Sequence, residues 1–463
     1  MRGWIYMTPH RGLRVDGRGL PILVEQAEAS DPLPNSADVI VVGAGIIGLL
    51  TAIGLKQAGL HPIIIEAANA GSGQSGRNLG FIRVQGRDEA EVALMARSSE
   101  LWGELSQKIG PQLSFRRSGH VSLASNARDV DRVTEWARVG ERFDVDFHQL
   151  RGEELYKLCP HLSKSYVFGG FTPRDGQADP QAVMRSLLDH VDQLGIALFQ
   201  QTPVTSIAIN DKSVKGVQTK RGYVKSNAVL LATGAWTSRL LAKAGIALPT
   251  HAGVATMAAT RPVAPLSEST MWEVGQLGFR QDAGGRIVFG LGGYVDVHVR
   301  WEDVRGAIST LPTFWSNRRA MNIKIGRPLL EDLTDVWRGR DLRPFKWAEF
   351  LPNDGFVKAG LARLAHMIPS LASELELDAV WTGLIDTTQD FLPAVGTAGV
   401  EGLLFVAGLS GHGFGLAPAL AEEVTEIMIG NRPEDTKLAH FAPARLKGYK
   451  SIHELQRLPR EHR

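Results

Sequence analysis

The sequence predicts a protein of the α/β plus α+β class, in which a parallel sheet covered by helices is joined to a second, mostly antiparallel β domain. Three observations predict this fold class. An apolar, β-branched run at residues 39–42 leads through a glycine turn into a helical pattern. Buried-strand patterns return much later, at 228–232 and 403–407. Residues 250–378 are instead rich in tryptophan, arginine and short strand-like runs.

The first element is a strand, a tight turn and a helix that share three spaced glycines. Gly43 permits the turn, Gly45 lets the backbone approach a pyrophosphate, and Gly48 lets the helix pack closely on the strand. This spacing alone is a weak signal, because residues 71–76 match it as well. Only the first match follows a buried strand and precedes a helix, so it predicts dinucleotide binding.

A second apolar strand at 62–65 strengthens this prediction. It ends at Glu66, where a carboxylate accepts hydrogen bonds from an adenosine ribose.

Length and composition limit the classes of protein. A chain of 463 residues suggests two or three domains, and a formal net charge of +2 predicts no strong attraction to nucleic acid or to an anionic membrane. The single cysteine, Cys159, excludes an internal disulfide framework and fits a reducing compartment. Residues 1–36 lack an apolar signal-peptide core, and the run 39–55 is short for a membrane span and interrupted by glycine. We expect no transmembrane segment, and a location in the cytoplasm or at the periphery of the inner membrane.

The remaining elements follow in order along the chain. They are a Gly/Ser-rich loop at 71–83, a helix at 88–108, a strand at 115–124, a helix at 129–142, a strand and turn at 166–176, a helix capped by Asp179 that ends at Gly195, a strand at 204–209, a hairpin at 216–224, a buried strand at 228–232, a strand at 285–290, a last buried strand at 403–408, and a helix at 416–428 with Pro418 in its first turn and Gly430 as its stop.

Four blocks of the sequence carry a resemblance to a known family: residues 39–66, 75–83, 231–236, and 381–396 continued by 407–418. Their order and spacing resemble the D-amino-acid oxidase superfamily of FAD enzymes, in the branch of sarcosine oxidases, glycine oxidases and γ-glutamylputrescine oxidases. The resemblance implies a discontinuous Rossmann-like FAD-binding domain and a mostly antiparallel β substrate-binding domain. We divide the chain accordingly into an N-terminal arm (1–36), the FAD-binding domain (37–110, 177–250 and 380–440), the substrate-binding domain (111–176 and 251–379) and a C-terminal tail (441–463).

The resemblance also implies which residues contact FAD. No cysteine occurs in 383–390, the segment that binds FAD covalently in some sarcosine oxidases, so we expect noncovalent FAD. The glycines of 411–415 precede a helix, whose N-terminus would stabilise negative charge on the reduced flavin; the alternative is an ordinary glycine-rich loop. The expected cofactor-binding residues are Gly43, Gly45, Ile47, Gly48, Glu66, Ala67, Ser75, Arg77, Asn78, Leu79, Val204, Ala232, Thr233, Gly234, Trp236, Gly411, His412, Gly413, Phe414 and Gly415.

Three residues are candidates for the substrate end of the site. Arg83 matches an arginine that contacts the substrate carboxylate in sarcosine oxidases, and its alternative role is an ion pair within the FAD loop. His412 is either a proton acceptor beside the flavin or a hydrogen-bonded loop histidine. Asp386 either caps a turn or attracts a cationic amine. Gly415 stands where the family has a second carboxylate-binding residue, a lysine, which implies a weaker grip on a small amino acid.

Other residue types are weaker indicators. No spacing of histidine, cysteine and acidic residues suits a metal ion, so we expect no metal site. Four aromatic residues either wall a substrate pocket or belong to a core, and the core is favoured: Trp272, Phe279, Tyr294 and Trp301.

The expected function is an FAD-dependent oxidation of the CH–NH bond of a small primary or secondary amine or amino acid of the sarcosine, glycine or D-amino-acid kind. Hydride transfer to flavin N5 would give an imine that water hydrolyses. One alternative is a nicotinamide-dependent Rossmann dehydrogenase, which leaves the 381–418 block without a role. The other is a flavoprotein subunit of a larger complex.

The electron acceptor is oxygen, a quinone or another oxidant. Sarcosine oxidases carry a lysine on the strand over the flavin, and the corresponding strand, 285–290, has its flavin-side position near Val288. No lysine occurs between Lys243 and Lys324, and Arg286 is expected to face solvent. Oxygen is therefore predicted to be a poor acceptor, unless His412 supplies the positive charge.

Overall fold

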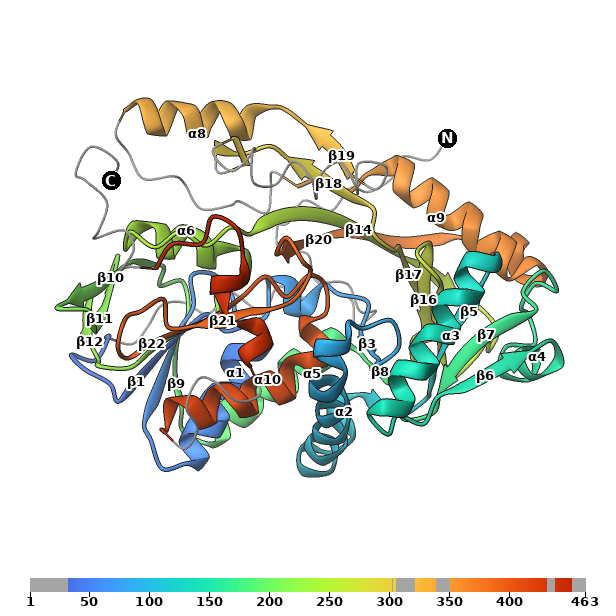
Figure 1. Ribbon diagram of the computed structural model, residues 1–463, viewed down its shortest axis with the longest axis horizontal. Coiled ribbons are helices and arrows are strands. Elements are labelled where there is room, and N and C mark those ends of the chain that lie inside the picture. Colours follow the sequence, from blue (N-terminus) through green and yellow to red (C-terminus); the bar gives the residue numbers. More distant parts are fainter. Residues whose placement is uncertain (1–31, 302, 305–320, 339–349, 431–437, 452–463) are drawn as a thin grey trace.

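The computed structural model describes residues 32–301, 303–304, 321–338, 350–430 and 438–451 (Figure 1). Residues 1–31 of the predicted arm and 452–463 of the predicted tail lie outside the described residues. The part of the tail that is described packs onto the protein, because Phe441 and Leu446 are buried in its cores.

A six-stranded sheet contains the glycine turn. Its order is β21-β22-β13-β1-β2-β9, and all neighbours are parallel except β21 and β22. The prediction that the chain returns to its first sheet at two later segments is confirmed. The strands are β1 (Val39–Val42), β2 (Pro62–Ile65), β9 (Ala197–Phe199), β13 (Val229–Leu231), β21 (Ala394–Gly396) and β22 (Leu403–Ala407).

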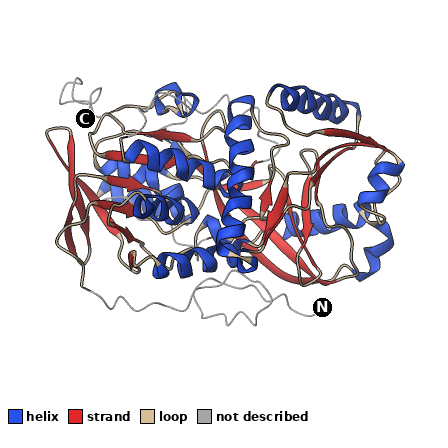
Figure 2. Cartoon of the chain, turned by 90° about the horizontal axis from the view of Figure 1, so that it is seen from below, coloured by secondary structure: helices blue, strands red, loops and turns tan. Residues whose placement is uncertain are grey.

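Both faces of this sheet are covered, because alternate residues of β1 point into different cores. Val39 and Val41 pack against α1 (Ile46–Gln57), α2 (Glu89–Ile109), α5 (Pro180–Gln193) and α10 (Gly413–Met428). Ile40 and Val42 pack against a small sheet of β10 (Val204–Asn210), β11 (Ser213–Thr219) and β12 (Gly222–Lys225), and against α6 (Thr237–Lys243). Figures 1 and 2 show this layered half of the molecule beside a second, strand-rich half.

Helix α10 corrects one prediction. It begins at Gly413, with His412 as its N-cap, so Pro418 lies inside the helix and not in its first turn. The start of the helix was not predicted, because the glycines of 411–415 carry no apolar side chain that would extend the helical pattern. At the other end Gly430 has φ +76°, which fits its predicted role as the stop.

The second large sheet is mostly antiparallel, as predicted. Its order is β19-β18-β14-β17-β16-β15-β5-β7-β6, with β20 also paired to β14. Its strands are β5 (His120–Ala124), β6 (His148–Arg151), β7 (Phe168–Thr172), β14 (His251–Pro262), β15 (Thr270–Glu273), β16 (Leu277–Gln281), β17 (Arg286–Leu291), β18 (Val295–His298), β19 (Met321–Lys324) and β20 (Leu377–Thr387). Helices beside it are α3 (Ala127–Arg142), α4 (Glu153–Leu158), α8 (Arg327–Trp337) and α9 (Asp354–Met367).

Two predictions about this half need correction. The single strand predicted at 115–124 is two strands, because Gly119 has φ +75° and turns the chain between them. The first of these joins a third small sheet of β3 (Phe81–Ile82), β8 (Gly176–Ala178) and β4 (Phe115–Arg116). Residues 380–387, which we assigned to the FAD-binding domain, pair with β14 in the large sheet. The other domain boundaries stay predictions.

Within the described residues, no helix combines the length and the apolar character that crossing a membrane requires.

Candidate functional site

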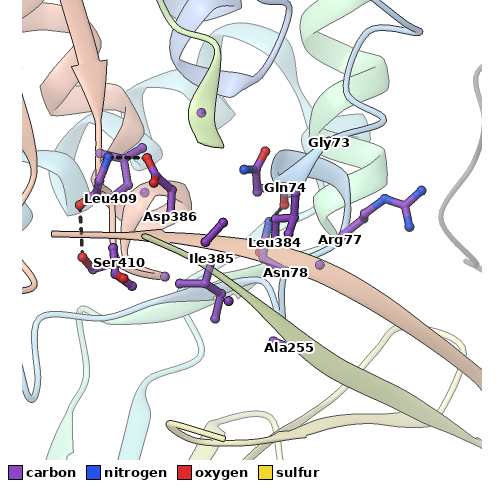
Figure 3. Close-up of a pocket in the computed structure, with 18 of the residues that line it drawn as sticks. Gly73, Gln74, Arg77, Asn78, Ala255, Leu384, Ile385, Asp386, Leu409 and Ser410 are labelled. Atoms are coloured by element: carbon purple, nitrogen blue, oxygen red, sulfur yellow. Dashed lines mark hydrogen bonds between the residues drawn. The ribbon is translucent and has the colours of Figure 1, made fainter. Parts of the chain in front are cut away.

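One large cavity of about 1620 Å³ joins the glycine turn to the large sheet. It begins at Gly43 and Glu66, continues along the 72–79 loop, and reaches Tyr294 and His412. Pockets for drug-sized ligands measure roughly 300–1,000 Å³, so this volume fits a dinucleotide together with a small substrate. Figure 3 shows residues of β20 and of the 73–78 segment that lie close together and line part of this cavity.

The three glycines of the turn have different surroundings. Gly43 has φ +105°, and a Cβ there would lie 2.5 Å from the carbonyl oxygen of Ala232. A Cβ on Gly48 would overlap the carbonyl oxygen of Gly43, so this glycine allows helix and strand to pack. A Cβ on Gly45 would meet only Ser75 Oγ, at 3.1 Å. Gly45 is thus the one of the three whose side-chain position opens toward the cavity, at a helix N-terminus suited to a phosphate.

Glu66 lies at the end of the cavity that is next to the glycine turn. Its Oε2 accepts a hydrogen bond from Ala44 N at 2.7 Å, and its Oε1 accepts one from Ala68 N at 2.8 Å. Burial raises the pKa of this carboxyl above its ordinary value, against the opposing effect of these hydrogen bonds. A carboxylate accepts about four hydrogen bonds, so Glu66 keeps capacity for ribose hydroxyls. These surroundings fit the adenosine half of FAD.

The 72–79 loop is braced from inside. Arg77 Nε donates to Ser72 O at 2.7 Å, and its Nη1 donates to Thr382 O of β20 at 3.3 Å. Burial lowers the pKa of Arg77 to about 10. Ser75 Oγ accepts from Ile46 N at 2.9 Å, at the start of α1. In Figure 3 the Arg77 side chain points away from Asp386. Arg77 therefore holds the loop to the large sheet.

Asp386 lies on β20 and is buried. Its Oδ2 accepts a hydrogen bond from Gly408 N at 2.7 Å (Figure 3). Its backbone carbonyl accepts another from Ser410 N at 2.7 Å. Burial raises the pKa of Asp386 to about 7. This geometry favours the turn-capping alternative over attraction of a cationic amine.

His412 meets an acidic residue that sequence reasoning missed. Its Nδ1 lies 3.0 and 3.2 Å from the two carboxylate oxygens of Glu91, a fully buried residue in the first turn of α2. Burial, with help from Arg87, lowers the pKa of His412 to about 4. The pKa of Glu91 is also lowered: hydrogen bonding to His412 and the nearby arginines outweigh its burial. At neutral pH an ionised Glu91 therefore accepts from Nδ1–H of a neutral His412, and Nε2 is the basic nitrogen.

Two arginines lie beside this pair. Arg83 donates to the carbonyl oxygen of Gln85, and its guanidinium lies 4.2 Å from the ring centre of Trp272. Burial and the neighbouring Arg87 lower the pKa of Arg83 to about 9. Arg87 is buried and lines the cavity, and its Nη1 has no hydrogen-bond partner among the described residues. Such a buried donor is suited to an anionic group of a ligand.

Arg87 and Glu91 were missed because both precede or begin a helix, where charged residues are normally solvated. The available signal was the run of charged residues at 83, 87 and 91, which leads from the loop into the first turn of the helix.

The aromatic candidates divide between cavity and core. Trp272 and Tyr294 line the cavity, and Trp272 stacks on Trp136 with ring centres 5.6 Å apart. Phe279 is buried in the core of the large sheet, while Trp301 is not among the cavity-lining residues described.

Most predicted cofactor-binding positions lie along the cavity wall, but two do not. Gly48 packs against β1, as described above. Gly415 faces α2, where its carbonyl oxygen accepts from Ser98 Oγ at 2.6 Å and from Trp102 Nε1 at 3.0 Å. All the other residues expected to bind FAD line the cavity, and so do Arg83 and Asp386.

The strand over the cavity also differs from expectation. Val288 is buried with Ala259 and Ala379 and does not line the cavity, whereas Gly290, two residues later on the same face, does. Arg286 does not face solvent: it is buried and pairs with Asp282 at 2.7 Å.

Comparisons with known proteins agree with this geometry. The sequence profile of the DAO family, described as FAD dependent oxidoreductase, matches residues 38–427. The 4-methylaminobutanoate oxidase (formaldehyde-forming) of Paenarthrobacter nicotinovorans is 25% identical over 438 residues, which are 91% of this chain and 47% of that protein. Glycine oxidase of Pseudomonas aeruginosa is 27% identical over 417 residues, 88% of this chain and 99% of that protein.

Human sarcosine dehydrogenase is 26% identical over 250 residues, 52% of this chain and 27% of that protein. The chain thus spans less than half the length of some curated relatives. Among solved structures, L-amino acid deaminase from Proteus myxofaciens has a TM-score of 0.81 at 21% identity, with 91% of this chain and 96% of that chain covered. This likeness shows the fold.

Proposed function

The chain belongs to the DAO family of FAD-dependent oxidoreductases, and from this premise we propose that it oxidises the carbon–nitrogen bond of a small amine or amino acid to an imine, which water then hydrolyses. Membership in an FAD-dependent family argues against the alternative of a nicotinamide-dependent dehydrogenase. The relatives named as amine or amino-acid oxidases and dehydrogenases support this choice of substrate.

The observation that carries the proposal is the polar end of the cavity. There a neutral histidine held by a buried carboxylate lies beside two arginines, one of which has a donor without a partner among the described residues. The residues that would hold FAD line the rest of the cavity, from Gly45 and Glu66 to the 411–414 turn. FAD, when bound, supplies the acceptor for the hydride that leaves the carbon beside the nitrogen.

The chain's own residues then have distinct roles. Arg87, with Arg83, binds the substrate carboxylate and orients the carbon–hydrogen bond. His412 Nε2 accepts a hydrogen bond, and then a proton, from the substrate ammonium group, because Glu91 holds the ring by Nδ1. Burial, and after it the positive charge of the two arginines, lower the pKa of His412. A bound carboxylate offsets their charge, so substrate binding raises the pKa of His412 and makes it a better base.

The test is anaerobic flavin bleaching by a panel of substrates. The panel contains glycine, sarcosine, other N-methyl amino acids and D- and L-amino acids, each paired with the analogue that has a hydroxyl in place of the amine. Bleaching by amines alone, with release of ammonia or a primary amine, is the expected result. Bleaching by the hydroxy acids alone would refute the proposal. Acid precipitation of the same protein should release FAD into the supernatant, since no cysteine lies in 383–390.

A second candidate is a flavoprotein unit of a larger assembly. The observation behind it is that the chain matches 47% of the methylaminobutanoate oxidase and 27% of human sarcosine dehydrogenase, both of which are longer proteins. Substrate turnover with an artificial acceptor by the isolated chain would argue against this candidate. We further propose a quinone or a partner protein as electron acceptor, and a location in the cytoplasm or at the inner membrane.

A further inference from the structure

Helix α8 buries acidic side chains and exposes apolar ones to water. Its acidic residues Asp332 and Asp335 are buried, with exposed fractions of 0% and 1%. Its outward face carries Leu330 and Trp337, which are 65% and 85% exposed, and Leu333 lies between them. A surface helix of a globular protein normally has the opposite arrangement. Figure 1 shows α8 at the outer edge of the molecule, beside β18 and β19.

An ion-pair network fixes this orientation. Asp332 accepts two hydrogen bonds from the guanidinium of Arg300, at 2.8 Å each, and one from Trp301 N at 3.1 Å. Arg239 Nη2 lies 3.6 Å from the same carboxylate. Rotating α8 about its axis to bury its leucines would leave these buried charges unpaired, which is strongly unfavourable. The apolar face therefore stays outward.

We give the name outer α8 patch to the exposed apolar side chains of α8 and of the strand and link that precede it. It consists of Ile323, Ile325, Leu330, Leu333, Val336 and Trp337. Ile325, on the link between β19 and α8, is 76% exposed. The patch is continuous with the cavity, because Ile323 and its neighbour Met321 also line the cavity wall. Contiguous exposed apolar residues mark an interaction surface.

The charges around the patch identify the occupant. Arg327 and Arg338, at the two ends of α8, are exposed; Arg327 pairs with Glu331 at 2.7 Å, and the other two acidic residues of the helix are buried, so Arg338 leaves the outward side with a net positive charge. A second copy of the chain bound face to face would bring the same basic ends together. An anionic lipid surface instead complements them. A helix of 11 residues is about 16 Å long, so it lies in the plane of a membrane interface and does not cross it.

We propose that the outer α8 patch docks this protein on an anionic phospholipid bilayer, with Leu330 and Trp337 inserted at the boundary between headgroups and acyl chains. Tryptophan is enriched at this depth of a bilayer, because its ring is apolar and its N–H is polar. The proposed docking does not require a strongly basic protein, because insertion of the apolar side chains supplies most of the attraction. It is therefore compatible with the small formal net charge of +2.

The test is vesicle flotation of the purified flavin-containing protein. Vesicles of phosphatidylcholine alone are compared with vesicles of phosphatidylcholine and phosphatidylglycerol. The wild type should float with the anionic vesicles, and the double variant Leu330→Ser/Trp337→Ser should partition about a hundredfold less, because each large apolar side chain accounts for roughly tenfold or more. FAD content and melting temperature should be unchanged, since both side chains point outward.

Val167→Ser is the matched control, because Val167 is also an exposed apolar residue, at 62%, but lies beside β7. It should float like the wild type. The proposal is overturned if the wild type does not float, if the double variant floats as well as the wild type, or if the control loses binding equally. A concentration-dependent dimer that the double variant abolishes, without flotation, would assign the patch to a second copy and overturn it too.

Discussion

Replacing Glu91 with glutamine tests whether the buried carboxylate controls the reactivity of His412. The two oxygens of Glu91 lie 3.0 and 3.2 Å from His412 Nδ1, so the change removes a charged hydrogen-bond acceptor at nearly constant shape. Hydrogen bonds to charged groups contribute about 1.5–3 kcal/mol, so kcat/KM should fall roughly 10- to 150-fold. Burial lowers the pKa of His412 to about 4, and Glu91 partly opposes this effect. Without the charge of Glu91, the pKa of His412 in the variant should therefore be lower than in the wild type.

The assay is kcat/KM measured as a function of pH, together with FAD content. In the wild type, kcat/KM should rise with pH as His412 loses its proton near pH 4, and the variant should keep a lower plateau with the rise shifted to lower pH. Glu89→Gln is the control, since Glu89 lies two positions earlier, is exposed and pairs with Arg142 at 2.7 Å. An unchanged plateau in Glu91→Gln, or an equal loss in the control, would refute the reasoning.

Three further predictions concern the cofactor, the substrate and the acceptor. Gly45→Val should fold but bind no flavin, because a Cβ at this position meets only Ser75 Oγ at 3.1 Å, whereas Gly48→Val should not fold. Absorbance measures the bound flavin and circular dichroism measures the folding of each variant. A folded Gly45→Val protein with a full complement of flavin would place the nucleotide elsewhere. Arg87→Ala should lower kcat/KM toward a carboxylate substrate by an equivalent of about 2–5 kcal/mol while FAD stays bound, and this loss should exceed that of Arg83→Ala. If Arg87→Ala has the same kinetics as the wild type, the role of Arg87 is structural. Stopped-flow reoxidation should be slow with oxygen and fast with a quinone, since Gly290 supplies no charge over the cavity; oxygen reoxidation as fast as turnover would identify an oxidase.

Much of the nucleotide half was predictable because its signals are local. A glycine turn, a continuous apolar β-branched run and an acidic residue at a strand end are visible within about thirty residues. The same locality explains the error at α10, where glycines carry no pattern, and the error at 380–387, where a strand beside the flavin-binding block pairs with the other sheet.

The sequence by itself determined the class of cofactor and predicted the positions that would hold it, since Gly43, Gly45 and Glu66 act through backbone geometry that neighbouring residues specify. Only the tertiary structure decided the chemistry at the substrate end. Glu91 and His412 are 321 residues apart in the chain and meet because α2 packs against α10. Likewise, Asp332 of α8 turns inward because it pairs with Arg300, a residue outside the helix. Periodicity shows that a helix has two faces, but the partner that each face meets depends on contacts between distant segments.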